Sequence, residues 1–393
     1  MGTQTIRRRH IIRGAAFLII CAALFPAEIR VLMSDMKAPF SVKSESGLSA
    51  ESGAHVFIAS NNEFRIDAGR DGVSVSGYGI YRQVDISSAA VIRLNGISLN
   101  GTVRFIPHNG SVAAIAVLDL EEYVRGVLPY EMQQDWPLEA LKAQALTARS
   151  YALHHMLLKK KDTPYDVDNT TKYQVYRGIV PGASNVNAAV AETEGEVIIY
   201  RGHIIPAYFH ASCGGYTEST YRIFGVDIPY LRGCPCYYCG TNARHWSFAV
   251  TKDEFAAKLA QAAVRVGAIH RVAVIERNRS GRVDAFLAAG DAGSKKINGG
   301  ELRKLMGAGR MQSLAFDVKL DETHVRFSGT GNGHGVGMCQ WGAYGMALAG
   351  LSYKDVVFLY YKTAEIHDYR ILRTLEPDIW KINETYLNSF TSH

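Results

Sequence analysis

The sequence predicts a mixed α+β fold, with a strand-rich core, one long helix that carries the candidate site, and a smaller second α/β lobe. Short strand-like segments separated by turn signals fill the chain up to residue 120. A helix opened by Asp135-Trp136-Pro137 then runs to about residue 159, and strands alternate with helices in the second half. At 393 residues and 47% hydrophobic content, the chain can bury a sizeable core or two.

The first strand is expected at residues 28–32, and an apolar run at 112–120 predicts another. Turn signals at Asn61-Asn62, 70–72 and Asn95-Gly96 separate the strands between them. The later elements are a helix at 185–193, a strand at 196–200, a helix at 252–266, a strand at 269–276, a hairpin turn at 279–281, a strand at 283–288, and a last helix from a capping box at 352–355 to residue 361.

Residues 1–27 are organised like a secretory signal. A basic region with four arginines precedes an apolar run at 15–25, which is short for a membrane span. An uncleaved anchor is the alternative, and Ile20 before Cys21 fits a lipoprotein cleavage site poorly. We therefore expect an exported protein, in the periplasm or on the extracytoplasmic face of the membrane or cell wall.

The net charge of the chain is mostly the charge of this signal. The formal value is +6, and without those four arginines a mature chain would carry about +2. This balance argues against a nucleic-acid binder and is compatible with an anionic cell-wall polymer as partner. No P-loop or dinucleotide-binding glycine pattern occurs, which argues against a nucleotide.

Glu131 is the candidate catalytic residue. Pro129 breaks the preceding pattern, so Glu131 is expected on a connection just before the long helix. Its neighbours Tyr130, Met132 and Trp136 carry no charge, and desolvation by such residues raises the pKa of a carboxyl. A carboxyl of this kind can donate a proton near neutral pH. The alternative interpretation is a solvated loop residue or a helix cap.

Polar residues recur at regular spacing along the long helix. Lys142 and Arg149 lie seven residues apart on one face, and Gln144 and Tyr151 repeat that spacing on another. Two interpretations stand side by side. The faces either line a groove for a polar polymer or belong to an ordinary amphipathic helix with a solvated side.

Long motifs in a fixed order resemble the stage II sporulation protein D / amidase enhancer (SpoIID/LytB) family of peptidoglycan-acting proteins. The resemblance covers residues 28–369. It is carried by LEEYVRGVLPYEMQQDWPLEALKAQALTARSYAL at 120–153, QVYRG at 174–178, AYFHASCGGYTE at 207–218, the spacing of Leu302, Arg303, Ser313 and Phe316, and GHGVGMCQWGAYG at 333–345.

The resemblance implies a lytic transglycosylase that cuts peptide-stripped glycan strands between N-acetylmuramic acid and N-acetylglucosamine, in cell-wall remodelling or sporulation. It implies Glu131 as the acid and then the base, with no cofactor for the chemistry. Lys142 and Arg149 would orient the sugar. The other expected substrate-binding residues are Gln144, Tyr151, His210, His334 and Gln340.

The alternative function is a non-catalytic wall-binding protein that enhances a partner amidase, as the family name implies. The presence of Glu131, Lys142 and Arg149 favours the enzyme. A zinc amidase is disfavoured because no HExxH motif occurs. In either case we expect glycan strands and a functional partner amidase as partners.

Cys213, Cys234, Cys236 and Cys239 crowd into a short stretch near His210 and His245. Zinc takes cysteine and histidine at such spacings, so one structural zinc is expected. Disulfides are the alternative in an exported protein, and a redox CxxC is disfavoured because no thioredoxin-like βαβ unit surrounds it.

Some members of the family bind zinc just before the QVY element. Residues 168–173 here contain neither cysteine nor histidine, so that zinc site is expected to be missing. Cys339 replaces the usual serine of the last motif and is expected to be a small buried thiol. From the extent of the resemblance we expect a main domain at 28–369, with 244–330 as its second lobe and 370–393 as a C-terminal extension.

Overall fold

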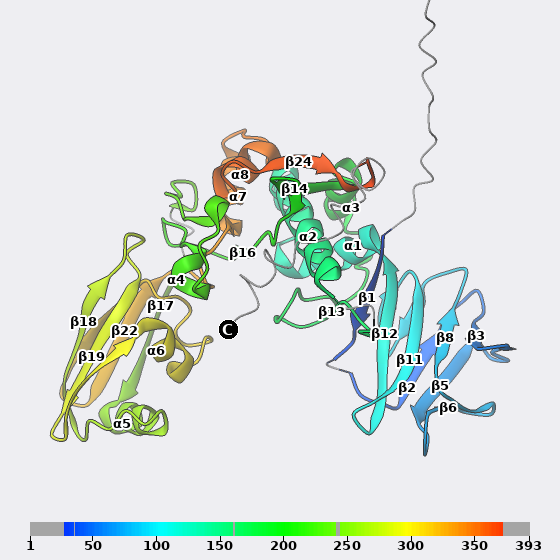
Figure 1. Cartoon of the computed structure of the whole chain (residues 1–393), viewed down its shortest axis with the longest axis horizontal. Helices are drawn as coiled ribbons and strands as arrows, with labels where there is room; N and C mark the ends of the chain where they lie inside the picture. Colours follow the sequence, from blue (N-terminus) through cyan, green and yellow to red (C-terminus); the bar gives the residue numbers. More distant parts are fainter. Residues whose placement is uncertain (1–26, 35, 160–161, 241–243, 372–393) are drawn as a thin grey trace, which may run out of the picture.

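The computed structural model describes residues 27–34, 36–159, 162–240 and 244–371. The expected signal or anchor and nearly all of the C-terminal extension lie outside these residues. The described chain is a mixed α+β fold, as predicted, in which a helical layer lies between the N-terminal sheets and a separate lobe (Figure 1). None of the helices in the described part combines the length and apolar character that a membrane crossing requires.

The N-terminal region forms two sheets with one continuous core. Their strand orders are β13-β1-β12-β11-β8-β3-β4 and β10-β9-β2-β5-β6-β7. Asn95 and Gly96 have φ of 45° and 89°, and this predicted turn joins β9 to β10. The strand bounds are β1 Glu28–Leu32, β2 Phe40–Lys43, β3 Ser49–Ser52, β4 His55–Ile58, β5 Glu63–Ala68, β6 Val73–Val75, β7 Gly79–Tyr81, β8 Val84–Ser87, β9 Ile92–Leu94, β10 Ile97–Leu99, β11 Thr102–His108, β12 Ser111–Asp119 and β13 Val167–Asp168.

Strand β12 leads the chain into the helical layer. Its apolar run is almost continuously buried, because β1 and β11 pair with it on either side and each of its two faces packs in a hydrophobic cluster. At its end, the carboxylate of Asp119 accepts a hydrogen bond of 2.8 Å from the amide of Glu121. Asp119 is therefore the N-cap of α1, Leu120–Glu131.

Helix α1 was not predicted, and the expectation that Glu131 lies on a connection is wrong. Pro129 sits within the helix, where its missing N–H removes one intrahelical hydrogen bond, and the helix ends two residues later. The amide of Met132 still bonds the carbonyl of Leu128 at 2.9 Å. Glu131 is consequently the last residue of a rigid element.

The long helix predicted after Pro137 is α2, Leu138–Leu158. It is buried on nearly all sides, since α1, α3, α7, α8 and β14 pack around it. The elements of this layer and its connections are α3 Ser184–Glu192, β14 Glu196–Tyr200, β15 His203–Ile204, β16 Phe209–His210, α4 Thr220–Phe224, β23 Met338–Cys339, α7 Gln340–Leu348, α8 Tyr353–Tyr360 and β24 Glu365–Asp368. The predicted capping box at Ser352 and Asp355 is present at the start of α8.

The lobe between His245 and Thr330 has a hydrophobic core of its own. Two antiparallel sheets, β17-β22-β21 and β18-β19-β20, pack with α5 and α6. Helix α5 ends at Gln261, before the predicted residue 266, because Ala263 adopts a left-handed φ of 61°. The bounds are β17 His245–Thr251, α5 Lys252–Gln261, β18 Ile269–Arg277, β19 Val283–Gly290, β20 Gly293–Asn298, α6 Gly299–Met306, β21 Phe316–Leu320 and β22 His324–Thr330.

Candidate active site

The end of α1 opens into a cleft of about 590 Å³. Glu131 contributes the carboxyl, α2 contributes Tyr151, and the segments around β16 and before β23 supply much of the opposite wall. The lining residues are Tyr130, Glu131, Tyr151, Thr171, Lys172, Tyr173, Val175, Tyr208, Phe209, His210, Ala211, Phe224, Asn332, Gly333, His334 and Gln340.

The Glu131 carboxyl is partly buried in this cleft. Burial raises its pKa above the ordinary value, although two hydrogen bonds oppose that change. The amide of Val175 donates to Oε1 at 3.3 Å, and the side chain of Gln340 also hydrogen-bonds the carboxyl. A carboxyl with this balance keeps its proton to higher pH than a solvated glutamic acid and can act as a general acid.

The uncharged neighbours predicted for Glu131 differ in how far they are exposed to solvent. Met132 and Trp136 are buried, whereas Tyr130 remains 44% exposed at the rim. The Trp136 ring lies 4.8 Å from that of Trp341, measured between centroids, and this contact fastens the α1–α2 connection onto α7. The position of Glu131 is therefore set by packing against a segment about two hundred residues further along the chain.

Gln340 links the carboxyl to a buried amide behind it. Its Nε2 donates to Oε1 of Gln144 at 3.4 Å, and Gln144 is fully buried with no hydrogen-bond partner for its own Nε2. The structure thus brings Gln340 and Tyr151 to the cleft, while Gln144 supports it from beneath.

His210 and His334 stand together in the opposite wall, with ring centroids 5.6 Å apart. Nδ1 of His210 donates to the carbonyl of Val336 at 3.1 Å, and its buried Nε2 has no hydrogen-bond partner. Nδ1 of His334 accepts from the amide of Val336 at 3.0 Å. Burial lowers the pKa of both rings, that of His334 to about 4, so both are neutral near pH 7.

The glycines around His334 let two segments approach closely beneath the cleft. Gly337 has a φ of 72°, and a Cβ there would lie 1.9 Å from the carbonyl oxygen of Tyr208. Only glycine fits that contact, because any side chain would push β23 away from β16. This part of the motif therefore serves the packing of β23 against β16.

Lys142 and Arg149 do not lie in the cleft, which corrects the expectation that they orient the sugar. Nζ of Lys142 pairs with Glu139 at 2.7 Å and with Glu192 at 2.6 Å. The fully buried guanidinium of Arg149 is held by Glu121 at 2.8 and 2.6 Å. Because α2 is buried on nearly every side, these two cations pair with carboxylates of α1, α2 and α3 instead of facing the cleft.

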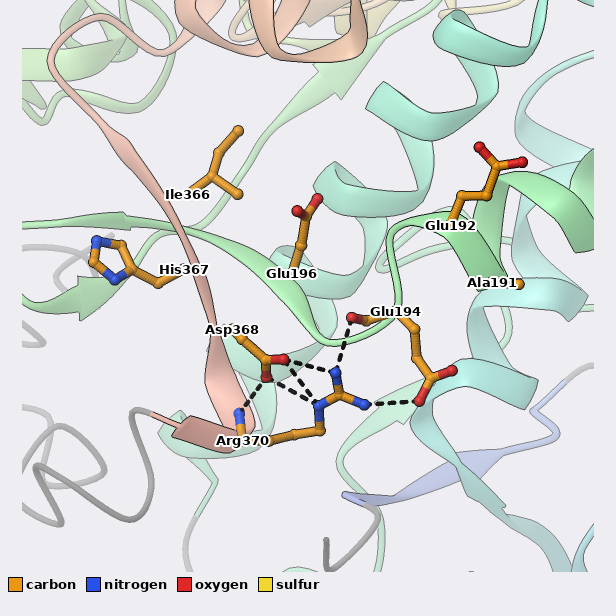
Figure 2. Close-up of a pocket in the computed structure, with 8 residues that line it drawn as sticks. All are labelled: Ala191, Glu192, Glu194, Glu196, Ile366, His367, Asp368 and Arg370. Carbon is orange, nitrogen blue, oxygen red and sulfur yellow. Dashed lines mark hydrogen bonds and ion pairs between the residues drawn. The ribbon is translucent and has the colours of Figure 1, made fainter. Parts of the chain in front are cut away.

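Glu192 belongs to a separate acidic pocket, shown in Figure 2. Arg370 bridges Asp368 and Glu194 there, and its guanidinium occupies the space between the two carboxylates. The residues lining this pocket are all different from those of the Glu131 cleft.

The cysteines form a compact group whose membership differs from the expected one. The sulfur atoms of Cys213, Cys236, Cys239 and Cys339 lie within 4.8 Å of one another. Cys339 takes part because β23 pairs with β16 in parallel, which brings it beside the segment of Cys213. Cys339 is a buried thiol, as expected, and its place among the other cysteines is an addition that the sequence did not indicate.

Cys234, His210 and His245 lie outside this group. The sulfur of Cys234 instead contacts the Thr217 hydroxyl at 3.4 Å. His245 is exposed at the start of β17, and His210 faces the cleft.

Several lining residues were missed by the sequence reasoning. Tyr173 directly precedes the QVYRG segment and Tyr208 lies inside AYFHASCGGYTE, so both were within reach of the motifs. Lys172 brings a cation to the rim. No local signal pointed to Phe224, whose ring lies 5.0 Å from that of Tyr208.

Comparison with known proteins agrees with this arrangement of motifs. Residues 108–200, which contain α1 and α2, match the family model described as stage II sporulation protein. Residues 240–337, which include the separate lobe, match a domain of unknown function.

Relatives extend the match over most of the chain. An uncharacterized protein of Brachyspira hyodysenteriae is 37% identical over 358 residues, or 90% of this chain and 96% of that protein. The stage II sporulation protein D of Bacillus amyloliquefaciens is 31% identical over 64% of this chain and 75% of its own length. The amidase enhancer of Bacillus subtilis is 28% identical over 63% of this chain, which spans only 40% of that longer protein. With its motifs in order and these relatives aligned across them, the chain belongs to the stage II sporulation protein D family.

Proposed function

We propose that this protein is a peptidoglycan lytic transglycosylase that cleaves peptide-stripped glycan strands between N-acetylmuramic acid and N-acetylglucosamine. Its relatives are named for sporulation and for the enhancement of an amidase, which supports a role at the cell wall outside the cytoplasm. The observation that carries the enzymatic proposal is a single, desolvated carboxyl in a cleft lined mainly by aromatic and uncharged residues, with Lys172 at its rim.

The number of carboxyls in the cleft favours this reaction over hydrolysis. Among the described residues that line it, Glu131 is the one aspartate or glutamate. Ordinary glycosidases use two carboxyl groups, one as acid and one as nucleophile or base. A transglycosylase that closes a ring within its substrate needs one, because a hydroxyl of the sugar replaces the nucleophile.

In the proposed reaction, protonated Glu131 gives its proton to the glycosidic oxygen as the bond to the muramic C1 breaks. The N-acetylglucosamine leaves with that proton on its oxygen. The Glu131 carboxylate then takes the proton of the muramic C6 hydroxyl, whose oxygen bonds C1 and closes the anhydro ring. The carboxyl is restored and no water is consumed.

The other residues of the cleft suit a glycan. Tyr151, Tyr173 and Tyr208 offer apolar faces with polar ends, which suit sugar rings. Nε2 of His210 is a buried acceptor without a partner in the protein, suited to a sugar hydroxyl. Gln340 hydrogen-bonds Glu131 and keeps its carboxyl oriented.

Lys172 at the rim gives a reason for the preference for stripped strands. Removal of the stem peptide leaves a free carboxylate on the muramic acid. A lysine at the cleft attracts that carboxylate, whereas the amide of an intact stem peptide carries no such charge. The partner amidase would produce the substrate of this enzyme.

The test is digestion of peptide-free glycan strands by the purified chain without its signal segment, followed by mass spectrometry. We expect anhydro-muramyl ends from stripped glycan and none from peptide-bearing wall. Products heavier by one water would identify a hydrolase instead. Glu131→Gln should abolish turnover and keep glycan binding, while Glu192→Gln, which removes a carboxylate outside the cleft, should behave like the parent protein.

A second candidate is the non-catalytic enhancer, favoured by the relative that carries that name. It predicts no glycan products at all. It also predicts that Glu131→Gln still stimulates an N-acetylmuramoyl-L-alanine amidase on intact wall as well as the parent protein does.

A further inference from the structure

Three segments that are distant in the sequence bring four cysteines to one point. Cys213 follows β16, Cys236 and Cys239 lie on the loop after α4, and Cys339 is the N-cap of α7. All four are buried, with exposed fractions of 2% or less. Their sulfur atoms lie within 4.8 Å of one another, and those of Cys213 and Cys239 are 3.6 Å apart.

These sulfur–sulfur distances fit a tetrahedral thiolate site. Zinc–sulfur bonds of about 2.3 Å place neighbouring sulfurs about 3.8 Å apart. All four sulfurs must then be mutual neighbours, as they are here. Two disulfides would require only that each sulfur approach one partner. The sequence CxxC at 236–239 is also a common half of structural zinc sites.

Hydrogen-bond donors surround the sulfurs. The amides of Cys213 and Gly342 each donate to Sγ of Cys339 at 3.3 Å, and the amide of Gly215 donates to Sγ of Cys213 at 3.4 Å. The hydroxyl of Tyr360 lies 3.0 Å from Sγ of Cys236. Metal thiolates take such donors in their outer shell, where these contacts fix the ligands and tune the metal.

A buried positive charge accompanies the cluster. Arg282 is 1% exposed, and its guanidinium donates to the carbonyl of Cys213 at 2.9 Å and to that of Tyr216 at 2.8 Å. A zinc ion with four thiolates has a net negative charge. The Arg282 guanidinium, which is bonded to the backbone of one ligand, offsets that charge. Four neutral thiols would carry no charge to offset.

We propose that Cys213, Cys236, Cys239 and Cys339 bind one structural zinc ion. The four cysteines fill all four coordination positions of the ion, so none is left open for catalysis. Its consequence for the cleft is mechanical. The ion ties the segment of His210 to the start of α7, where Gln340 directly follows Cys339. The binding of metal does not depend on the proposed transglycosylase activity.

Zinc content and ligand type in the full chain, purified without chelator, test the site without any activity measurement. We expect about one equivalent of zinc, and X-ray absorption should show four sulfur neighbours at about 2.3 Å. Replacement of zinc by cobalt should give the charge-transfer and visible bands of a tetrahedral thiolate complex. Zinc below one-tenth of an equivalent, bound iron, or disulfides among these cysteines in peptide maps would each overturn the proposal.

Serine variants identify the ligands. Cys339→Ser should lose at least ten-fold in zinc affinity. The matched control is Cys234→Ser, because Cys234 is also buried and lies on the same loop but outside the cluster. It should keep the full equivalent of zinc and the cobalt spectrum. Equal loss in both variants would refute the assignment of ligands, and the absorption measurement on the unaltered chain decides the matter should Cys339→Ser fail to fold.

Discussion

Arg149 and Glu121 form a buried two-pronged ion pair, with Nε to Oε1 at 2.8 Å and Nη2 to Oε2 at 2.6 Å. Glu121 stands in the first turn of α1, and Arg149 is in the middle of α2. The pair therefore joins the helix that ends in Glu131 to the helix that supports it. Arg149 also donates to the carbonyl of Glu196 at 3.0 Å, so it ties β14 to the same point.

Glu121→Gln should destabilise the protein by about 3–5 kcal/mol in urea unfolding, because the buried Arg149 charge loses its partner. The double variant Glu121→Met, Arg149→Leu should recover most of that loss, since it leaves no buried charge. Asp227→Asn breaks the exposed pair with Arg232 and serves as the control with little effect. A double variant as unstable as the single one would contradict this account.

The two lysines near the site should differ in their effect on glycan. Lys172→Met removes the rim cation and should raise KM several-fold with little change in kcat, an effect that weakens at high salt. Lys142→Met should leave both kinetic constants nearly unchanged, because Lys142 is paired with Glu139 and Glu192. Steady-state kinetics on stripped glycan checks this. A larger effect of Lys142→Met than of Lys172→Met would indicate that Lys142 binds the substrate.

The pH profile of turnover should follow the Glu131 carboxyl. Burial raises its pKa above the ordinary value of about 4.3, so the acid form persists into the mildly acid range. The rate should peak between mildly acid and neutral pH and fall on the alkaline side as Glu131 loses its proton. Because burial keeps His334 neutral above a pKa of about 4, that ring should add no step near neutrality. A rate that is flat from weakly acid to clearly alkaline pH would remove Glu131 from the role of acid.

The same raised pKa predicts a pH-dependent difference in stability. Between the ordinary pKa and the raised one, the folded protein holds a proton at Glu131 that the unfolded chain releases. The free energy of unfolding of the parent protein therefore decreases as pH rises through this window and levels off above it. Glu131→Gln does not lose stability in this way. Its free energy of unfolding relative to that of the parent protein should therefore be higher at alkaline pH than at acid pH. Parallel unfolding curves at several pH values measure the difference, and no trend would contradict the desolvation of Glu131.

Gly342→Ala should damage the cysteine cluster without altering a ligand. A Cβ at this position would lie 1.9 Å from the Tyr360 hydroxyl and 2.7 Å from Sγ of Cys236. We expect a zinc content well below one equivalent and a lower melting temperature. Gly309→Ala, where a Cβ meets nothing within 4 Å, is the matched control and should retain its metal. Full zinc in Gly342→Ala would show that Cys236 is not held as a ligand.

The sequence by itself determined the local elements and the identity of the candidate acid. The span of α2, the Asn95-Gly96 turn and the capping box of Ser352 depend on residues a few positions apart, whose preferences act without the rest of the fold. Glu131 stood out because its near neighbours are uncharged and because it lies in the segment that resembles the SpoIID/LytB family. The sequence did not predict that Glu131 lies on a helix. Proline usually breaks a helix, and the local sequence does not show that Pro129 belongs to one.

Only the tertiary structure decided what the polar residues of α2 do and which cysteines meet. A spacing of seven residues places Lys142 and Arg149 on one face, but the elements packed around that face decide whether it meets solvent, substrate or a carboxylate. Cys339 joins Cys213 across 126 residues through the parallel pairing of β16 with β23. Such long-range contacts depend on the summed packing of the whole chain, so short-range sequence patterns do not encode them.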